Sequence, residues 1–330
     1  MTRTLLGVLA IGVLTGCGAL GGVEHSLPAD VPLEPVDEGP DSPDVDGITV
    51  TLDEPGAEPR RALRYQAALG TPERLHMAWT ASSKGRDYDG SRWKESGSVA
   101  LDVDLVPRRT KGRGLVEYDV VLRNVAVTSA GAVGSEAYAE VKRDALEGGT
   151  AVGVVSTRGL GVQINPRLAR IPDRGAAYAV KAIWETVGRS SVPLPLEEIG
   201  VGARWQVVDS TRDLGVETTR TRTFTLTSLE DDLGWVDVET RTVAENQSFK
   251  VARLPKGTTV VMRRYEALTQ GKESFHLRRF TPIEGTSEGT VTSDVLATLP
   301  VHGEKTRTST GDYAGTVRAV RVPELPTPQD

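Results

Sequence analysis

Residues 98–105 read Ser-Val-Ala-Leu-Asp-Val-Asp-Leu (SVALDVDL), and this stretch decides the fold class. Its larger apolar residues, Val99, Leu101, Val103 and Leu105, occupy every second position. Because successive side chains of a β-strand point to opposite faces, a period of two predicts a strand with one buried and one solvated face. Strands of this kind are typical of antiparallel sheets.

The same alternation recurs along the chain. Residues 116–123 repeat it, and acidic, Gly-containing turn signals at 87–90 and 230–234 separate neighbouring runs. Shorter runs that set an apolar face are 48–52, 63–67, 75–79, 203–207, 224–226 and 275–277. We therefore predict a mainly β (α+β) fold with a large curved antiparallel sheet, in which residues 48–52 add an edge strand.

Two segments break the period of two and predict helices. Ser135–Leu146 opens on a good N-cap residue and closes before two glycines. Asp173–Val187 places Val180, Ile183 and Trp184 on one face. We expect the second helix to pack on the sheet or to fill its concave side.

A weak internal similarity relates residues 149–157 to residues 285–293, since both read Gly-Thr-x-x-Gly-x-Val followed by two hydroxyl residues. One interpretation is a duplication, with similar halves at 60–170 and 200–322 flanking the segment 173–205. The alternative is chance similarity between two glycine-rich turns that enter strands.

The N-terminal residues have the features of a targeting segment. Arg3 precedes an apolar run, Leu5–Leu14, which is too short to span a bilayer. Leu14, Thr15, Gly16 and Cys17, the only cysteine, then match a lipobox. The stretch resembles the signal sequence of bacterial lipoproteins. The resemblance implies removal of residues 1–16 and acylation of Cys17 by a diacylglycerol and a further acyl chain, such as palmitate, which together would hold a protein firmly on a membrane.

The alternatives for this segment are a short buried helix with a chance cysteine, or a cleaved signal peptide with a free thiol. Residue 18 bears on the final membrane. It is Gly and not the Asp that retains lipoproteins in the inner membrane of enteric bacteria, so the resemblance favours the outer membrane in a cell that has one.

Charge divides the remaining chain. Residues 18–59 hold eleven acidic residues and seven prolines but neither Lys nor Arg, so we expect residues 17–59 to form a disordered tether. Residues 60–330 are nearly balanced, with 38 basic and 34 acidic residues, which does not favour a nucleic-acid partner. We expect a single β-rich domain at 60–322 and a flexible tail at 323–330.

One stretch matches a catalytic pattern. Gly285-Thr-Ser287-Glu-Gly289 fits G-x-S-x-G, and Asp294 and His302 follow in the order found in α/β-hydrolases. That pattern requires a strand-to-helix turn, whereas residues 290–295 are rich in strand formers. We interpret the stretch as a glycine-punctuated turn and keep a serine hydrolase as a remote alternative.

No cofactor or metal site is predicted. His25, His76, His276 and His302 lack metal-ligand spacing, and Asp87-x-Asp89-Gly90 fits a hairpin turn better than a calcium loop. A further segment, Gly200-Val-Gly202-Ala-Arg-Trp205, enters a strand after a proline-rich stretch. It resembles a Gly-x-Gly-Ala-x-Trp segment of exported bacterial lipoproteins over about residues 173–295, which implies an envelope location and no particular chemistry.

These observations favour a lipid-anchored cell-envelope protein, a non-enzymatic binding or structural module on a flexible stalk. The expected partners are membrane lipid through Cys17 and an envelope protein, a glycan or an apolar ligand. The alternative is a carrier of lipid or another hydrophobic ligand in a half-barrel cavity, which would need a large apolar cavity on the concave face.

Overall fold

A computed structural model describes most of the chain beyond the N-terminal region. The described residues are 45, 47–66, 68–112, 114–131, 135–167, 174–213, 216–249, 257–300 and 303–320. The signal segment, Cys17 and its lipobox, most of the acidic tether, His25, His302 and the C-terminal tail lie outside them.

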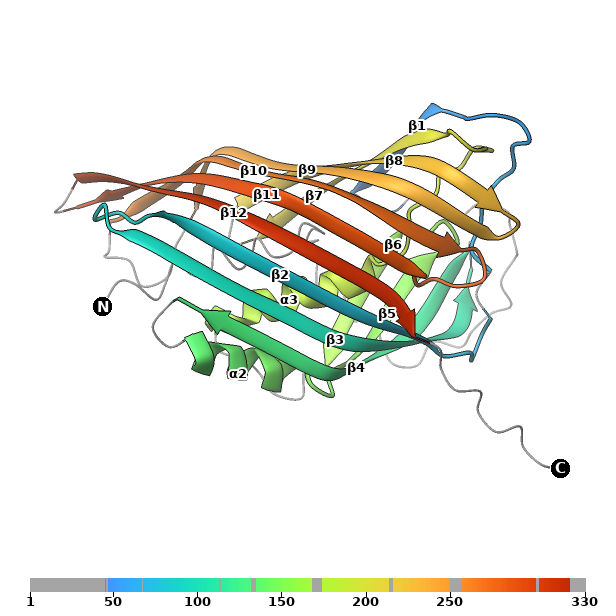
Figure 1. Cartoon of the computed structure of the whole chain (residues 1–330), viewed down its shortest axis with the longest axis horizontal. Coiled ribbons are helices and arrows are strands. Elements are labelled where there is room, and N and C mark those ends of the chain that lie inside the picture. The colour runs from blue at the N-terminus through green and yellow to red at the C-terminus, as the bar shows by residue number, and fades with distance from the viewer. Residues whose placement is uncertain are drawn as a thin grey trace.

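The described chain forms one antiparallel sheet of twelve strands, as the alternating runs predict (Figure 1). The strands are β1 (Ile48–Glu54), β2 (Glu73–Arg86), β3 (Arg92–Lys111), β4 (Leu115–Ala130), β5 (Thr150–Ser156), β6 (Gly161–Arg167), β7 (Arg204–Asp213), β8 (Val216–Glu230), β9 (Leu233–Phe249), β10 (Thr259–His276), β11 (Glu284–Leu299) and β12 (Gly303–Val320). Their spatial order is β1-β7-β8-β9-β10-β11-β12-β2-β3-β4-β5-β6, so the sheet is open, with β1 and β6 at its edges.

The sheet consists of the edge strand β1 and two meanders, β2–β6 and β7–β12, and the pairing of β12 with β2 joins the meanders. The register of that pairing runs from Thr308 opposite Arg86 to Val320 opposite Arg74. The two similar segments noted in the sequence fall in β5 and β11, and each of these is the next-to-last strand of its meander.

Both predicted helices are confirmed. They are α2 (Ser135–Leu146) and α3 (Arg174–Gly188), and Figure 1 shows both on the same side of the curved sheet. We call the face that they cover the inner face and the opposite one the outer face. On α3 the expected residues Val180, Ile183 and Trp184 are buried. The apolar stripe of the helix therefore supplies part of the core.

The main core lies between the inner face and the chain that covers it. Trp205 on β7 stacks on Phe224 of β8, with ring centroids 5.4 Å apart. The indole Nε1 of Trp205 donates a 2.8 Å hydrogen bond to the carbonyl of Pro193, so the proline-rich segment is fixed to the sheet. A smaller core at the other end of the sheet includes Phe249 and Met262.

The folded domain begins before residue 60. Strand β1 pairs with β7 from Ile48 onward, which confirms the predicted edge strand. Gly56 packs so closely on the 199–203 segment that a Cβ there would lie 2.3 Å from the carbonyl oxygen of Gly200. Residues 48–59, which the charge pattern assigned to the tether, thus belong to the sheet and its flank.

One expected strand is wrong. Leu63 and Tyr65 are buried but join no ladder. Tyr65 instead donates its backbone N–H to Thr157 and its hydroxyl to the carbonyl of Val192. The alternation at 63–65 therefore reflects two side chains anchored in the core from an irregular segment. Neither helix in the described part of the chain is long and apolar enough to cross a membrane.

Gly153 of β5 lies directly opposite Tyr118 of β4, and a Cβ on Gly153 would sit 2.2 Å from the Tyr118 ring. We expect Gly153→Ala to destabilise the domain by ~1–3 kcal/mol through overpacking. Urea unfolding would measure it. The double variant Gly153→Ala/Tyr118→Leu should recover part of the loss, and an unchanged midpoint for Gly153→Ala would contradict this packing.

Candidate functional site

A band of polar side chains crosses the inner face between the two cores. On β8 the inward positions continue from Leu226 and Phe224 to Arg222 and Arg220, because alternate residues share a face. Thr240 of β9 lies opposite Arg222. The apolar inner face thus gives way to charged and hydroxyl groups along single strands.

Three arginines surround one buried carboxylate in this band, and we call this group the arginine cluster. Asp209 on β7 has a fully buried side chain and lies directly opposite Arg220. Its oxygens are 2.5 Å from a nitrogen of Arg220, 3.5 Å from Arg222 and 3.8 Å from Arg189, which directly follows α3. The side chains of Arg220, Arg222 and Arg189 are 1%, 11% and 6% exposed, respectively.

The arginines of the cluster set the charge state of Asp209. Burial alone would raise the pKa of Asp209, but the charges of the three arginines outweigh it and hold that pKa below its usual value. Asp209 is therefore ionised at neutral pH. Nη1 of Arg220 is buried and has no hydrogen-bond partner among the described residues. Such an arrangement is costly unless further negative charge lies nearby.

The cluster borders a cavity of about 120 Å³, the inner cavity, between the end of α3 and the inner face. Arg222 and Arg189 line it, and hydroxyl residues contribute much of the remaining wall. The hydroxyl residues are Thr186, Ser190, Ser191, Thr240, Thr269, Thr286, Ser287 and Thr316. Arginines and hydroxyls together provide hydrogen-bond donors on several sides of one small space.

Small residues in one register row line the cavity. Gly271 of β10 lies opposite Ser287 of β11, which lies opposite Gly315 of β12. A Cβ at Gly315 would lie 2.8 Å from Trp79 Cδ1 and 2.9 Å from Ser287 Oγ, so a larger residue there would displace these side chains. The G-x-S-x-G stretch is therefore part of a strand, and its interpretation as a turn is wrong. Its inward residues Gly285 and Ser287 line the inner cavity.

A second carboxyl group, Glu273 of β10, lines the same cavity. Its neighbours across the ladders are Val236 and Gly285, which offer it no charge. Burial raises the pKa of Glu273 to about 7, although the positive charge of Arg222 opposes the shift. Glu273 therefore changes its charge near neutral pH, within a cavity that also contains two arginines.

Two of the three hydrolase residues, Ser287 and Asp294, are not brought together. Ser287 and Asp294 lie seven residues apart on the same strand, which at about 3.3 Å per residue separates them by roughly 23 Å. Of the described histidines, His76 contacts Asp102 on the outer face, with Nδ1 2.8 Å from Oδ1. No group of three potential metal ligands occurs among the described residues. The Asp87–Gly90 segment forms the hairpin turn between β2 and β3, as predicted.

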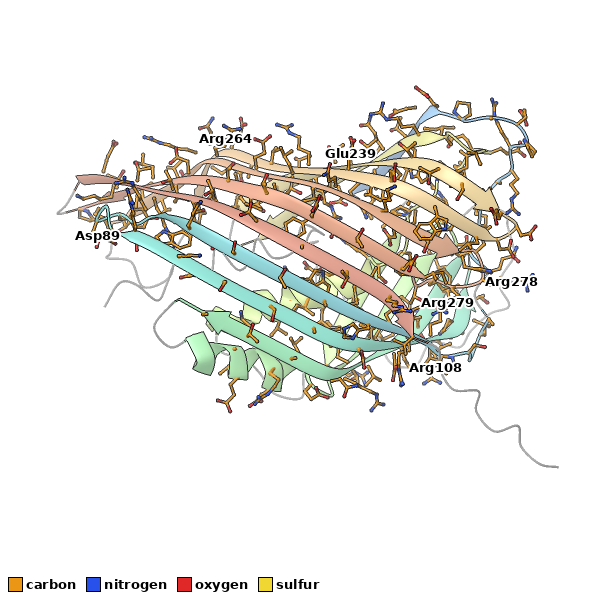
Figure 2. The ribbon with its side chains drawn as sticks, viewed as in Figure 1. Asp89, Arg108, Glu239, Arg264, Arg278 and Arg279 are labelled. Carbon is orange, nitrogen blue, oxygen red and sulfur yellow. The ribbon has the colours of Figure 1, made fainter. Side chains whose placement is uncertain are left out.

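The outer face carries a shallower hollow of about 1030 Å³, the outer groove. Two rows of outward side chains form its walls and cross six strands from β8 to β2. Most of them are polar, among them Glu239, Arg241 and Glu288. Figure 2 shows Glu239 on the face away from the helices. The groove is wider and more open than the inner cavity, which is only partly enclosed.

No motif singles out the residues of the arginine cluster, and Glu273 stands in none either. The sequence Arg220-Thr-Arg222-Thr-Phe224 does contain a signal. Its two arginines alternate in register with a core aromatic residue, so all three side chains point to the same face of the strand. Asp209 has the same relation to Trp205. Charged residues at inward positions of a strand can thus indicate a buried polar site.

No protein-family model matches the chain, and no curated protein matches its sequence. Among solved structures, an outer membrane channel from Pseudomonas putida F1 is 11% identical, with 77% of this chain and 97% of that one covered and a TM-score of 0.24. OccK5 from Pseudomonas aeruginosa is 6% identical, with 78% and 100% covered and a TM-score of 0.26.

A protein from Bacteroides fragilis, described as exported and as having a YmcC-like fold, is 8% identical to this chain. The match covers 79% of this chain and 100% of that one, with a TM-score of 0.21. TM-scores of this size do not establish a common fold, and nothing about the function of this chain follows from them.

Asp209→Asn should be strongly destabilising, because it removes a buried carboxylate that lies within 3.8 Å of three buried arginines. We expect a loss of about 3–5 kcal/mol in the free energy of unfolding. Asp237→Asn is the matched control, since Asp237 is 48% exposed and 3.8 Å from Lys272, and it should cost less than about 1 kcal/mol. Equal losses for the two variants in urea unfolding would contradict the role given to Asp209.

Glu273→Gln should stabilise the protein in a pH-dependent way. The folded-state pKa of Glu273 is above its unfolded value, so the folded state binds the proton more tightly. Its stabilising contribution is complete below about pH 4.5 and is lost as pH rises through 7. The variant should therefore gain on the order of 2 kcal/mol over wild type between pH 4.5 and 8. A difference that stays constant across this range would show that Glu273 titrates normally.

Proposed function

We propose that this chain is a lipid-anchored protein of the cell envelope that acts as a non-enzymatic binding module, with the inner cavity as its binding site. The observation that carries the binding role is the arginine cluster beside a partly enclosed cavity. An enclosed space in which a few polar groups converge is the usual form of a ligand site. The anchor rests on the sequence from Leu14 to Cys17.

The segment between the anchor and the sheet suits a stalk. Strand β1 begins at Ile48, so roughly 30 residues separate it from Cys17. Their acidic, proline-containing composition favours a disordered chain, which would span on average about 30 Å. The folded domain would then stay close to the membrane without being held against it. Gly18 favours the outer membrane as its location.

The composition of the inner cavity supports binding rather than catalysis. It contains cationic and hydroxyl groups that can hold a polar ligand, whereas Ser287 lies roughly 23 Å along its strand from Asp294. The carrier alternative is less well supported. A volume of about 120 Å³ lined by arginines and hydroxyls is too small and too polar for an acyl chain, and the walls of the outer groove are mostly polar.

The anchor is tested by Cys17→Ser in cells that process lipoproteins, with Ser26→Ala in the tether as the control. We expect wild type and Ser26→Ala to incorporate labelled palmitate and to sediment with membranes. Cys17→Ser should remain unlabelled and either stay uncleaved or appear in the soluble fraction, because the acyl chains supply the membrane affinity. Cleavage of Cys17→Ser with unchanged membrane sedimentation would refute the anchor.

The binding role is tested by native mass spectrometry of the full chain carrying Cys17→Ser. A bound small molecule that is lost on Gly315→Leu, which places a bulky side chain at the cavity wall, would support the inner cavity as the site. A ligand that remains bound to Gly315→Leu would place the site elsewhere, and a chain without any bound molecule under native conditions would count against a resident ligand.

A further inference from the structure

We infer that the outer face carries a docking surface for an anionic phospholipid membrane at the tip of the β2–β3 hairpin. The surface consists of four exposed cationic side chains, Lys84, Arg86, Arg92 and Lys94, and we call it the hairpin patch. This inference goes beyond the binding role proposed for the inner cavity, which lies on the other face of the sheet. It uses the proposed anchor for one of its arguments.

The register of the hairpin brings the four cations together. Lys84 lies opposite Lys94, and Arg86 lies opposite Arg92. Because alternate residues share a face, they point outward like Ser82, which lines the outer groove. Like charges that lie directly opposite each other destabilise a strand pair. No ion pair or side-chain hydrogen bond joins any of the four to another of the described residues. The hairpin thus concentrates positive charge that its own contacts do not stabilise.

The acidic groups near the hairpin patch leave it positive. On the outer face, Asp312 of β12 lies one outward position from the row of Lys84. Glu266 of β10 is further away and already pairs with two arginines. In the turn of the hairpin, the charge of Asp87 acts on an inward arginine of β12, and Asp89 accepts a hydrogen bond from the turn backbone. Four cations therefore face solvent beside a single outward carboxylate.

The hairpin patch borders a shallow hollow that suits a phosphate group. The hollow has a volume of about 360 Å³, and its lining includes Lys84, Arg86 and Arg92 together with Thr308 and Thr310 of β12. Ammonium, guanidinium and hydroxyl groups all donate hydrogen bonds to phosphate oxygens. No acidic side chain of the described residues lines this hollow. Its composition therefore favours the phosphate of a lipid headgroup.

The hairpin holds the patch at one extremity of the sheet. Asp87 donates its backbone N–H to the carbonyl of Ser91 at 2.8 Å, which closes the turn. Figure 2 shows Asp89 of this turn at one end of the sheet and Arg108 of β3 near the other. Both helices lie on the inner face, so they leave the patch open to a flat surface (Figure 1).

The stalk enters the sheet level with the hairpin patch. The register that starts at Ile48 of β1 crosses the sheet to Ser83 of β2, the residue before Lys84. Seven steps of about 4.8 Å between neighbouring strands amount to roughly 34 Å. The stalk spans a comparable distance on average. An anchor at Cys17 would keep lipid headgroups at a high local concentration around the patch, which favours a membrane over a dissolved polyanion.

Vesicle sedimentation tests the docking. The chain from residue 17 onward with Cys17→Ser is used, because Leu5–Leu14 would itself enter a bilayer; this chain keeps every described residue. It should bind vesicles of phosphatidylglycerol and not vesicles of phosphatidylcholine. Binding should weaken at least tenfold between about 0.1 M and about 0.5 M NaCl, because salt screens exposed charges.

Two matched double variants locate the contact. Arg86→Gln/Arg92→Gln should bind phosphatidylglycerol vesicles at least tenfold more weakly, since each cation near an anionic surface contributes roughly fivefold to binding. Arg108→Gln/Arg109→Gln removes the same charge near the other end of β3, where both arginines pair with acidic residues of β4. This control should bind within twofold of wild type.

Two further measurements separate binding from folding. Arg86→Gln/Arg92→Gln removes two directly opposed like charges, so its midpoint in urea should equal or exceed that of wild type. A weaker vesicle interaction then cannot result from misfolding. Arg86→Lys/Arg92→Lys keeps the charge and should retain binding within threefold.

The inference is overturned if wild type does not bind phosphatidylglycerol vesicles at about 0.1 M NaCl, or binds both lipids equally. Equal binding by Arg86→Gln/Arg92→Gln and Arg108→Gln/Arg109→Gln would also overturn it. Soluble polyphosphate that binds more tightly than vesicles at equal phosphate concentration, through the same two arginines, would replace the membrane by a dissolved polyanion. If vesicle binding fails while Cys17 still incorporates palmitate, this inference falls and the proposed function stands.

Discussion

The structure depends on how the inner face of a very large sheet is covered. Two helices and the segment after α3 have to shield twelve strands from water, and they are too few to do so with apolar contacts alone. Beneath α3 and the 189–205 segment the face is apolar and closely packed around Trp205 and Phe224. Where this cover ends, inward positions become charged, and Asp209 compensates part of the charge of Arg220 and Arg222.

The same constraint operates beneath α2. Lys142 of that helix is almost fully buried, and burial lowers its pKa to about 8, with the charge of Glu95 opposing the shift. Near the turn between β2 and β3, the guanidinium group of Arg307 lies 4.6 Å from the centre of the Trp93 ring. Asp89 marks this end of the sheet in Figure 2, and Arg278 marks the opposite end. Buried ionisable groups thus accumulate wherever the apolar cover is incomplete.

Much of the fold follows from local patterns. Period-two runs at 98–105 and 116–123 predict β3 and β4, and both helices begin and end within a residue or two of their expected limits. The patterns mislead at Leu63 and Tyr65, which are buried although they belong to no strand. They also mislead at Gly285, which lies within a strand and not in a turn. The candidate site could not be predicted in the same way, because it depends on register. Only the pairing of β7 with β8 places Asp209 opposite Arg220, and a one-residue shift would separate them.

The pairing of β12 with β2 imposes an order of events on a chain that is made from its N-terminus. Strand β2 is complete early, and β3 pairs with one of its edges. The partner of its other edge, β12, is the last of the described strands. Until residues 303–320 arrive, β2 presents an open edge that any other extended chain can join. During synthesis or translocation this edge of β2 therefore stays unpaired until the C-terminal strand is available. Loss of that single strand would divide one twelve-stranded sheet into two smaller sheets, each with an additional exposed edge.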